Sequence, residues 1–410
     1  MPQVEKFDHI YTLYMICLDD EIEFIRETVK KISGEHKRLV FFFSLFSIQY
    51  DEIKELVKEL RENTDNKTET IFIGGGPHIT GEPFSVRDLD LNYGISGEGE
   101  KSIAGILEFL SNGKHGSVNL NGIPGLIIHK RNENKLVFNR HHFSSELLDC
   151  FPPFSEKYGF FGPIEITRGC YHSCNYCQVP QLYGCKVRHR SIENILFHTE
   201  KLVENGVSNI RFITPNAASY GSDDKNSVNL KAIELLLRSI KEKYKRRVKL
   251  YFGSFPSEIR PESVSKDLLF LIKKFCDNKR IIIGAQTGQN SLLKKINRGH
   301  TIEQVFDSVK IILKNGLEPH VDFIFGLPGE TLSDREETLR VMNEMIKEGA
   351  KMHAHYFMPL PGTPLQNKMP EPLDSEFTGK LEFLHGNQAL YGFWKKQKNS
   401  VYCKNFKTKK

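Results

Sequence analysis

Three cysteines stand close together in the stretch ITRGCYHSCNYCQVP, residues 166–180. Cys170, Cys174 and Cys177 follow the spacing C-x3-C-x2-C. Cysteine thiolates bind zinc and iron–sulfur clusters, and a closed zinc site or a fully ligated cluster takes four ligands. Three ligands on one loop suit instead a four-iron cluster whose fourth iron stays open for an exogenous ligand.

Other interpretations of the cysteine loop stay open at this point. His172, Cys185 or His189 could complete a tetrahedral zinc site, although the second pair of ligands typical of zinc sites is missing. A cluster that only transfers electrons would need its fourth ligand close by. Unliganded thiols are a further alternative. The remaining cysteines are scattered and are expected to be inert or buried thiols: Cys17, Cys150, Cys185, Cys276 and Cys403.

Composition indicates an ordinary globular α/β chain. The 410 residues are 39% hydrophobic and 26% charged, with a net charge of +6. No apolar run reaches the ~18 residues that a membrane span needs, and acids interrupt the N-terminal segment where a secretory signal would be apolar. We therefore expect a cytoplasmic protein without disulfides and without a membrane partner. The basic residues are spread widely, so nucleic acid is not an expected partner.

The N-terminal part alternates apolar runs with helical patterns, which indicates a parallel, doubly wound sheet. Strands are expected at 9–16, 38–44, 69–76 and within 91–100, and helices at 21–32, 50–63 and 101–113. Two apolar runs around the turn 132–134 then predict a hairpin over 123–142. The stretch 149–163 is rich in proline and glycine and is interpreted as a linker.

Glycine-rich turns at 74–83 and 94–100 follow two of these strands. Ligands of doubly wound sheets bind beyond the carboxyl ends of the strands, where both turns are expected. A dinucleotide-binding G-x-G-x-x-G pattern does not fit, because Pro77 stands where a helix should open and no acid follows at the right distance.

A second alternation begins at residue 164. Strands are expected at 164–167, 209–214, 248–253, 280–286, 319–326 and 352–358, with amphipathic helices between them. Six βα units predict a partial (βα)6 TIM-like barrel, whose chemistry lies on loops at the carboxyl ends of the strands. The cysteines fall on the loop after the first of these strands. Residues 376–397 are predicted to be a helical extension.

The cysteine loop, with Tyr176 just before its last cysteine, resembles that of the radical SAM superfamily. The resemblance covers roughly residues 160–365. It implies that Cys170, Cys174 and Cys177 bind a 4Fe–4S cluster, whose open iron takes the amino and carboxylate groups of S-adenosylmethionine (SAM). One electron would then cleave SAM to methionine and a 5′-deoxyadenosyl radical. Tyr176 would lie near the adenine.

Further stretches resemble the same family. FIFGLPGET (323–331) is similar to the fifth-strand segment along the adenine, and GAQTGQN (284–290) to the fourth strand near the ribose or methionine. The glycines are expected to permit a close approach of the backbone to the ligand. A plain strand-to-helix turn is the alternative for 323–331. The positions that the resemblance carries over are Ile324, Gly326, Glu330 and Gln286.

Three other stretches add less. FITPNA (212–217) lies where the family contacts the methionine amino group, but the usual glycine-glycine-glutamate form is absent. FMPLPGTPL (357–365) is similar to the closing segment near the substrate. Arg188 and Arg190 could meet the SAM carboxylate, although solvated side chains are expected.

The two glycine turns together resemble the cobalamin-binding domain that precedes many radical SAM domains, over roughly residues 8–112. The D-x-H-x-x-G motif that supplies a cobalt ligand is absent, since Gly76 stands two residues before His78. Many members of the combined family also lack it. A domain that serves only as a scaffold is the alternative. The resemblance places these positions near the corrin: Ser44, Gly74, Gly75, Gly76, His78, Gly97, Glu98 and Gly99.

The resemblance divides the chain into a Rossmann-like domain of cobalamin-binding type (1–122), a hairpin and linker (123–159), a radical SAM partial barrel (160–365) and a C-terminal extension (366–410). It implies a radical SAM enzyme that uses cobalamin to methylate an unactivated carbon. An electron donor such as ferredoxin or flavodoxin is the expected partner. The sequence identifies neither a small-molecule nor a macromolecular substrate.

Two other functions are compatible with parts of the sequence. Methylthio transfer to RNA or protein fits INRGHTIEQV (296–305), but those enzymes carry three further cysteines in a different N-terminal domain, where this chain has Cys17 and Cys150. A non-catalytic iron–sulfur or zinc module is the other.

Overall fold

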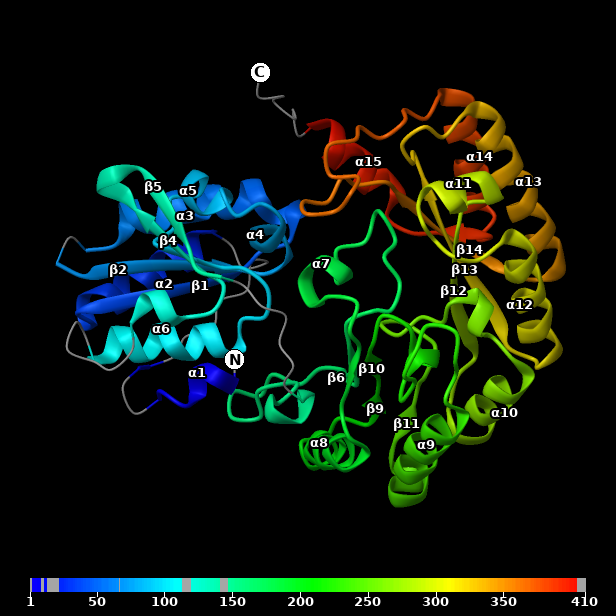
Figure 1. The fold of residues 1–410 in the computed structure, drawn as a ribbon, viewed down its shortest axis with the longest axis horizontal. Coiled ribbons are helices and arrows are strands. Elements are labelled where there is room, and N and C mark those ends of the chain that lie inside the picture. Colours follow the sequence, from blue (N-terminus) through cyan, green and yellow to red (C-terminus); the bar gives the residue numbers. More distant parts are fainter. Residues whose placement is uncertain are drawn as a thin grey trace. The chain divides into compact units, whose positions relative to one another are not determined.

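The structure is a computed structural model that describes residues 2–8, 11–12, 22–65, 67–112, 119–140 and 147–403. The strand predicted at 9–16 lies for the most part outside these ranges, as does Cys17. Two compact units make up the chain: Met1–Ser145 with 181–183 and 360–363, and the remainder. Each unit combines helices with a sheet, which confirms the α/β class (Figure 1).

The first unit contains a five-stranded sheet in the order β1-β2-β3-β4-β5. The first three strands run parallel, and β4 and β5 form the predicted hairpin, which pairs antiparallel with β3. The strands are β1 (Arg38–Ser44), β2 (Glu69–Gly75), β3 (Tyr93–Ile95), β4 (Leu126–Lys130) and β5 (Lys135–Phe138). The helices are α1 (Pro2–Glu5), α2 (Ile22–Glu35), α3 (Tyr50–Asn63), α4 (Pro77–Gly81), α5 (Ser85–Asp88) and α6 (Glu100–Asn112).

Both faces of this sheet are covered. Phe72 of β2 packs into a cluster with α2 and α3, whereas its neighbours Ile71 and Ile73 pack against α6 on the other face. Side chains alternate between the faces of a strand, so a run that is apolar throughout needs a cover on both sides. Helix α3 meets this need with Ile53, Val57 and Leu60, which are buried at helical spacing.

The second unit is built on parallel strand pairs. β10 pairs with β6, β11 with β9, and a four-stranded sheet runs in the order β12-β13-β14-β15. Ile282 of β12 donates its backbone N–H to the Gly253 carbonyl at 3.0 Å, which links this sheet to the segment after β11. The strands are β6 (Ile164–Glu165), β7 (Thr167–Arg168), β8 (Arg188–His189), β9 (Asn209–Ile210), β10 (Phe212–Ile213), β11 (Lys249–Leu250), β12 (Arg280–Gln286), β13 (Glu318–Phe325), β14 (Lys351–Tyr356) and β15 (Leu390–Tyr391).

The first predicted strand of this unit is shorter than expected and is split. β6 pairs in parallel with β10, but β7 pairs antiparallel with β8. The second ladder is two residues long. The Ile166 carbonyl accepts a bond from Arg190 N–H while its own N–H bonds the Ile213 carbonyl. Local apolar character predicts a strand, but it cannot reveal this change of partner.

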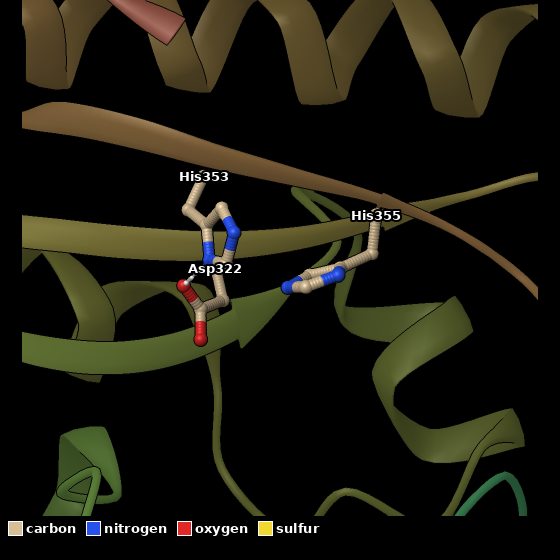
Figure 2. Close-up of side chains that lie close together, drawn as sticks. All are labelled: Asp322, His353 and His355. Atoms are coloured by element: carbon tan, nitrogen blue, oxygen red, sulfur yellow. Dashed lines mark hydrogen bonds and ion pairs between the residues drawn. The ribbon is translucent and has the colours of Figure 1, made fainter. Parts of the chain in front are cut away.

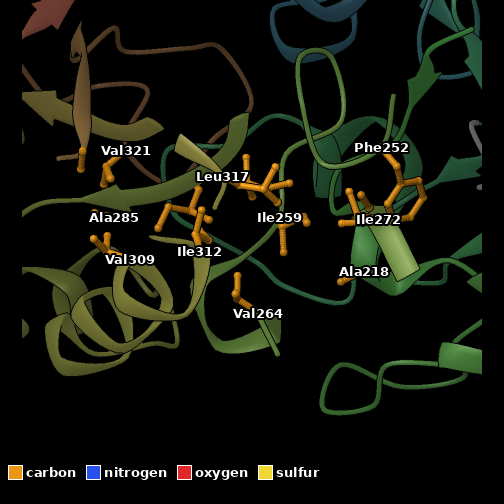
Figure 3. Packing of buried hydrophobic residues seen from close by; sticks show 14 of the residues in the cluster. Ala218, Phe252, Ile259, Val264, Ile272, Ala285, Val309, Ile312, Leu317 and Val321 are labelled. Atoms are coloured by element: carbon orange, nitrogen blue, oxygen red, sulfur yellow. The ribbon is translucent and has the colours of Figure 1, made fainter. Parts of the chain in front are cut away.

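Helices pack along the outer side of these strands, from α8 to α13 in Figure 1. From residue 179 onward the helices are α7 (Val179–Tyr183), α8 (Ile192–Glu204), α9 (Leu230–Tyr244), α10 (Lys266–Phe275), α11 (Asn290–Lys295), α12 (Ile302–Lys314), α13 (Leu332–Glu348), α14 (Ser375–Gly386) and α15 (Trp394–Cys403). Figure 3 shows how the core joins strands to helices: Ala285 and Val321 come from β12 and β13, and Ile272, Val309 and Ile312 from α10 and α12.

The C-terminal stretch differs from the prediction of continuous helix at 376–397. Helix α14 ends at Gly386, and Leu390 and Tyr391 form β15, which pairs in parallel with β14. The open edge of β14 offers unpaired backbone groups, and pairing with a passing segment satisfies them. In the described parts of the chain, the helices are too short or too polar to span a bilayer.

Candidate functional site

The three cysteines lie where they were predicted, on the loop between β7 and α7. Cys174 is buried, and Cys170 and Cys177 are partly buried. The N–H of Cys177 donates to the Cys174 carbonyl at 3.0 Å. Gly169 opens the loop with a φ of +86°, and a Cβ there would lie 2.6 Å from the Lys186 carbonyl oxygen, so the entrance of the loop requires glycine.

Two arginines, Arg260 buried and Arg298 partly buried, face the central cysteine. Nη1 of Arg260 lies 3.8 Å and Nη1 of Arg298 lies 3.7 Å from the Sγ of Cys174. Arg260 also donates to the Arg298 carbonyl and pairs with Glu262. Burial would raise the pKa of Glu262, but His300 and Arg260 beside it lower that pKa to about 2. Neither arginine was singled out from the sequence, although Arg298 lies within INRGHT.

This donor set fits an anionic cluster. Burial raises the pKa of the Cys170 thiol and raises that of Cys177 to about 11. Without a metal, the thiols of Cys170 and Cys177 would stay protonated at neutral pH, so a bound metal must displace their protons. The guanidinium groups of Arg260 and Arg298 supply positive charge and N–H donors next to one sulfur, which is what an iron-bound thiolate accepts.

Tyr176 and Ile324, predicted to lie near one ligand, lie against the same apolar cluster. Both pack against a small apolar cluster, separate from the main core, that consists of Leu292, Leu293, Ile296, Leu327 and Phe357. The cysteine loop is tied to the same region, because Asn175 N–H donates to the Ile296 carbonyl at 2.9 Å and Asn297 Nδ2 to the Ser173 carbonyl. An apolar surface next to the cysteines results.

Gln286 ends β12 in an unusual conformation. Its φ is +74°, it is buried, and the pairing of β12 with β13 shifts register between Gly284 and Gln286. A residue other than glycine in the left-handed region is strained, and such residues gather at functional sites. A Cβ added to Gly284 would collide with Gln286 and Arg298, and Arg298 Nη2 donates to the Gly284 carbonyl at 3.1 Å. Gln286 is therefore beside the arginine that contacts Cys174.

Glu330 and Gly326 build a tight turn after β13. The Oε2 of Glu330 accepts the Gly326 N–H at 2.7 Å and the Arg335 Nε–H at 3.1 Å. Gly326 has a φ of +74°, and a Cβ there would lie 2.5 Å from the Tyr356 ring. The close approach expected at this glycine is thus made by Tyr356, within the protein. Burial raises the pKa of Glu330 to about 7, although Arg335 opposes the shift.

The expectation that the side chain of Arg190 is solvated is wrong. Arg190 is 1% exposed. Its guanidinium donates to the carbonyls of Glu165 and Phe151 and to Asn194 Oδ1. It ties β6 to the segment that precedes β6 in the same unit and to α8, because a buried guanidinium needs several acceptors. Arg188 is buried as well.

The glycine turns of the first unit meet at one edge of its sheet. Gly75 ends β2 opposite Ser44 of β1, and the Gly97 N–H donates to Thr80 Oγ1 at 2.9 Å. Gly76 has a φ of +90°, and a Cβ there would lie 2.9 Å from the Leu45 nitrogen. The predicted positions therefore lie at or just after the carboxyl ends of neighbouring strands: Ser44, Gly74, Gly75, Gly76, His78, Gly97, Glu98 and Gly99.

The expectation that Pro77 blocks a helix is wrong. Helix α4 begins at Pro77, because the first helical position needs no N–H donor and suits the φ of proline. His78 of this helix is buried, with Ser47 Oγ 3.0 Å from Nδ1 and Ser85 Oγ 3.0 Å from Nε2. Both ring nitrogens are engaged, so the structure presents no free imidazole nitrogen at this position.

A polar set inside the second unit was not anticipated. Asp322 of β13 lies 2.9 Å from His353 Nδ1 of β14, with His355 two residues further along (Figure 2). Glu258 is close enough to Asp322 for burial and the two carboxylates' repulsion to raise the pKa of Glu258 to about 7. The signal was present in HAH (353–355), whose histidines must share one face of a strand.

Comparison of sequences finds a known family within the second unit. Residues 164–342 match the radical SAM superfamily. A tRNA-2-methylthio-N(6)-dimethylallyladenosine synthase of Sulfurihydrogenibium sp. is 30% identical over 254 residues, 61% of this chain and 55% of that enzyme. An uncharacterized protein of Methanocaldococcus jannaschii, MJ1620, is 25% identical and covers 81% of this chain and 70% of its own. The chain spans about half the length of the methylthiotransferases that it matches.

Comparison of structures extends the likeness to both units. The radical SAM methyltransferase TsrM of Kitasatospora setae, solved with cobalamin and a [4Fe-4S] cluster, has a TM-score of 0.66 at 18% identity and covers 89% of this chain and 72% of its own. The cobalamin-dependent SAM radical enzyme OxsB has a TM-score of 0.63 at 16% identity and covers 94% of this chain and 50% of its own. At these identities the likeness establishes the fold. Residues 164–342 match the radical SAM superfamily, whose members use a 4Fe–4S cluster and SAM.

Proposed function

We propose that this chain is a cobalamin-dependent radical SAM methyltransferase that acts on an unactivated carbon. The observation that carries the proposal is the cysteine loop, which holds three thiols and whose Cys174 faces Arg260 and Arg298. A 4Fe–4S cluster bound by Cys170, Cys174 and Cys177 would supply the electron that cleaves SAM to the 5′-deoxyadenosyl radical. The other residues bind, orient and exclude water.

The apolar surface next to the cysteines suits the adenine of SAM. Tyr176 and Ile324 flank it, and the Tyr176 ring gives a flat face for stacking. We assign Gln286 to the ribose or methionine, because its strained backbone holds the amide beside Arg298. Gly326 and Glu330 act indirectly, since they shape the turn that follows Ile324.

Cobalamin would occupy the glycine-rich edge of the first unit. The fold likeness to TsrM and OxsB, both solved with cobalamin, supports this assignment. The edge consists of small residues and backbone around Gly76 and Gly97, so a flat macrocycle can approach it closely. With both nitrogens of His78 engaged, cobalt would have no histidine ligand from this position. Bound cobalamin would supply the methyl group.

The domain assignment follows from these roles. We propose a Rossmann-like cobalamin-binding domain at 1–122, a hairpin and linker at 123–159, a partial (βα)6 barrel at 160–365 and an extension at 366–410. The parallel pairs from β6 to β14 support the barrel. A ferredoxin or flavodoxin is proposed as the electron donor.

The decisive experiment is anaerobic reconstitution with iron, sulfide, SAM and a reductant. Formation of 5′-deoxyadenosine is expected for the parent chain and should be lost in Cys174→Ala. Cys185→Ala is the matched control, because Cys185 is an exposed free cysteine near the same loop and should leave the rate unchanged. If the Cys174 variant matches the parent, or if the parent forms none, the proposed function fails.

Methylthio transfer remains the second candidate, because the sequence relatives include tRNA methylthiotransferases at 30% identity. Those enzymes need a second cluster, so they contain about eight iron atoms per chain where this proposal expects about four. An iron count separates the two. A non-catalytic module with a fully ligated metal has no place for SAM, and spectra that change when SAM is added would exclude it.

A further inference from the structure

The inner face of the sheet β12-β13-β14 is polar, although its other face belongs to the main core. Val321, Phe323 and Phe325 of β13 pack into that core, so Asp322 and Ile324 point the opposite way. On β14, Met352, Ala354 and Tyr356 are in the core, and the histidines alternate with them onto the inner face: His353 and His355. Burying this face costs free energy unless its polar groups are paired or bind a ligand.

Strand register brings one carboxylate and two imidazoles together on this face. Asp322 pairs directly with His353 in the parallel ladder, and His355 follows two residues later on the same side of β14. One ligand atom from each residue can be chosen so that all three lie within 4.8 Å of one another. Figure 2 shows the three side chains close together, with His353 and His355 extending from the same strand.

The rings are held but keep ligand nitrogens available. His353 stacks on Tyr391 of β15 with ring centroids 4.5 Å apart, and Nδ1 of His353 lies 2.9 Å from Asp322 Oδ1. With the imidazole proton on Nε2, a metal ion can take the place of the Nδ1 proton, so that Nδ1 of His353 and Asp322 become ligands of one ion. Among the described residues, neither ring nitrogen of His355 has a hydrogen-bond partner; its contact is with the His353 ring, 4.2 Å away.

We propose that Asp322, His353 and His355 bind a divalent transition-metal ion inside the second unit, distinct from the cluster of the cysteine loop. Two imidazoles and one carboxylate are a donor set of open zinc sites, which leave one position for an exogenous oxygen or nitrogen. Ligands ~2.0–2.2 Å from one zinc ion lie about 3.5 Å apart, so small side-chain rotations close the site.

The metal would face the space that the proposed reaction uses. Asp322 pairs in register with Gly284, whose carbonyl accepts a bond from Arg298, and Arg298 contacts Cys174. An oxygen or nitrogen of the substrate would take the open position and be held beside the cluster loop. This role in orienting the substrate rests on the proposed function, whereas the binding of the metal does not.

The test counts metals in the full chain. The protein is reconstituted anaerobically with its cluster, incubated with excess zinc, passed over a chelating resin and analysed for zinc and iron. About one zinc per chain is expected for the parent. His355→Gln and Asp322→Asn should bind zinc at least ~10-fold more weakly with the iron count unchanged. His385→Gln, which removes an exposed imidazole from α14, is the matched control and should retain the zinc.

A second arm shows where the ion sits. In the chain with Cys170→Ala, Cys174→Ala and Cys177→Ala, cobalt(II) should still bind, without the sulfur-to-cobalt charge-transfer absorption of thiolate sites. Adding His355→Gln should abolish its d–d bands. The proposal is overturned if the parent protein binds no zinc, or if His355→Gln binds as much zinc as the parent. It is also overturned if the chain without the three cysteines loses its zinc while its circular dichroism spectrum stays parental. If the parent fails to bind zinc but still forms 5′-deoxyadenosine, only the metal site is overturned. If it binds zinc but forms no 5′-deoxyadenosine, only the proposed function is overturned.

Discussion

At the scale of single residues, Arg298 makes the contact with the clearest chemical consequence. Its guanidinium lies 3.7 Å from Cys174 Sγ and is anchored on the Gly284 carbonyl. Arg298→Met removes a positive charge and a charged hydrogen bond from Cys174, which binds the cluster in the proposed function. The electron that reduces the cluster then has a higher free-energy cost, because a nearby positive charge is gone. The reduction potential of the cluster should therefore fall by about 60–130 mV, the equivalent of ~1.5–3 kcal/mol. Potentiometry followed by electron paramagnetic resonance measures it.

The control for this prediction is Arg340→Met, since Arg340 is 53% exposed in its side chain and lies on α13. It should leave the potential unchanged. Arg298→Lys keeps the charge but loses the planar fork, and an intermediate potential is expected. If Arg298→Met shifts the potential no more than Arg340→Met does, the guanidinium does not interact with the cluster.

Glu330 predicts a pH dependence of stability. Burial raises its folded-state pKa to about 7, from an ordinary value of 4.5. Between these two values the folded state binds more protons than the unfolded state, so stability falls as pH rises through that window. The full loss is on the order of 3 kcal/mol, at 1.36 kcal/mol per pKa unit.

Glu330→Gln cannot ionise and should lose that slope while it keeps an acceptor for the Gly326 N–H. Urea unfolding at several pH values between about 4.5 and about 8 measures the difference between variant and parent. Parallel slopes in the two proteins would mean that Glu330 is not protonated preferentially in the folded state.

Residues that act within one loop could be predicted from the sequence, whereas those joined across strands could not. The cysteines are set by local spacing, and the structure places them on the expected loop. Asp322 and His353 are 31 residues apart and meet only through the register of β13 and β14. Arg260 and Cys174 are 86 residues apart. No periodicity within one segment contains that information.

At the scale of elements, the turn from β13 to α13 depends on Gly326. Gly326→Ala would place a methyl group 2.5 Å from the Tyr356 ring in a left-handed conformation. Overpacking typically costs about 1–3 kcal/mol and the conformation adds about 1–2 kcal/mol. Thermal unfolding should show a lower midpoint for this variant, together with weaker binding of SAM, because Ile324 is displaced.

A second glycine serves as the matched control. Gly379 lies inside α14, and a Cβ there meets nothing within 4 Å. Gly379→Ala should stabilise the helix by up to ~1 kcal/mol, since alanine has the higher helix propensity. A destabilised Gly379→Ala, or a Gly326→Ala chain as stable as the parent, would contradict the packing described for these positions.

Helices and strands could be predicted where the apolar periodicity extends over several turns. They were missed where hydrogen bonding to a distant strand determines the structure. Helix α3 coincides with the predicted range 50–63 because its buried stripe repeats over several turns. β15 was missed, since two residues between helical patterns carry no strand signal and are strand only by pairing with β14. The split of the first barrel strand at Ile166 has the same origin, a change of hydrogen-bonding partner.

At the scale of the whole molecule, the α/β class followed from two successive alternations of strands and helices. The structure adds that the first sheet is covered on both faces and that the hairpin joins it through β3. The identity of the ligand at the glycine edge is a different kind of question, because Gly76 and Gly97 report only that a close approach is possible there. A bound molecule must be measured directly.

The last prediction concerns both cofactors in one chain. Protein purified anaerobically from cobalamin-fed cells and reconstituted should contain about four iron atoms and about one cobalt. Because Ser47 and Ser85 engage both nitrogens of His78, the reduced cobalt(II) should show no nitrogen splitting in its electron paramagnetic resonance spectrum from this residue. His78→Gln, which keeps one donor and one acceptor for the two serines, should therefore bind cobalt at the parental level. Cobalt that is absent from the parent would leave the first unit as a scaffold, and nitrogen splitting that disappears in His78→Gln would show that the ring leaves its serines to ligate the metal.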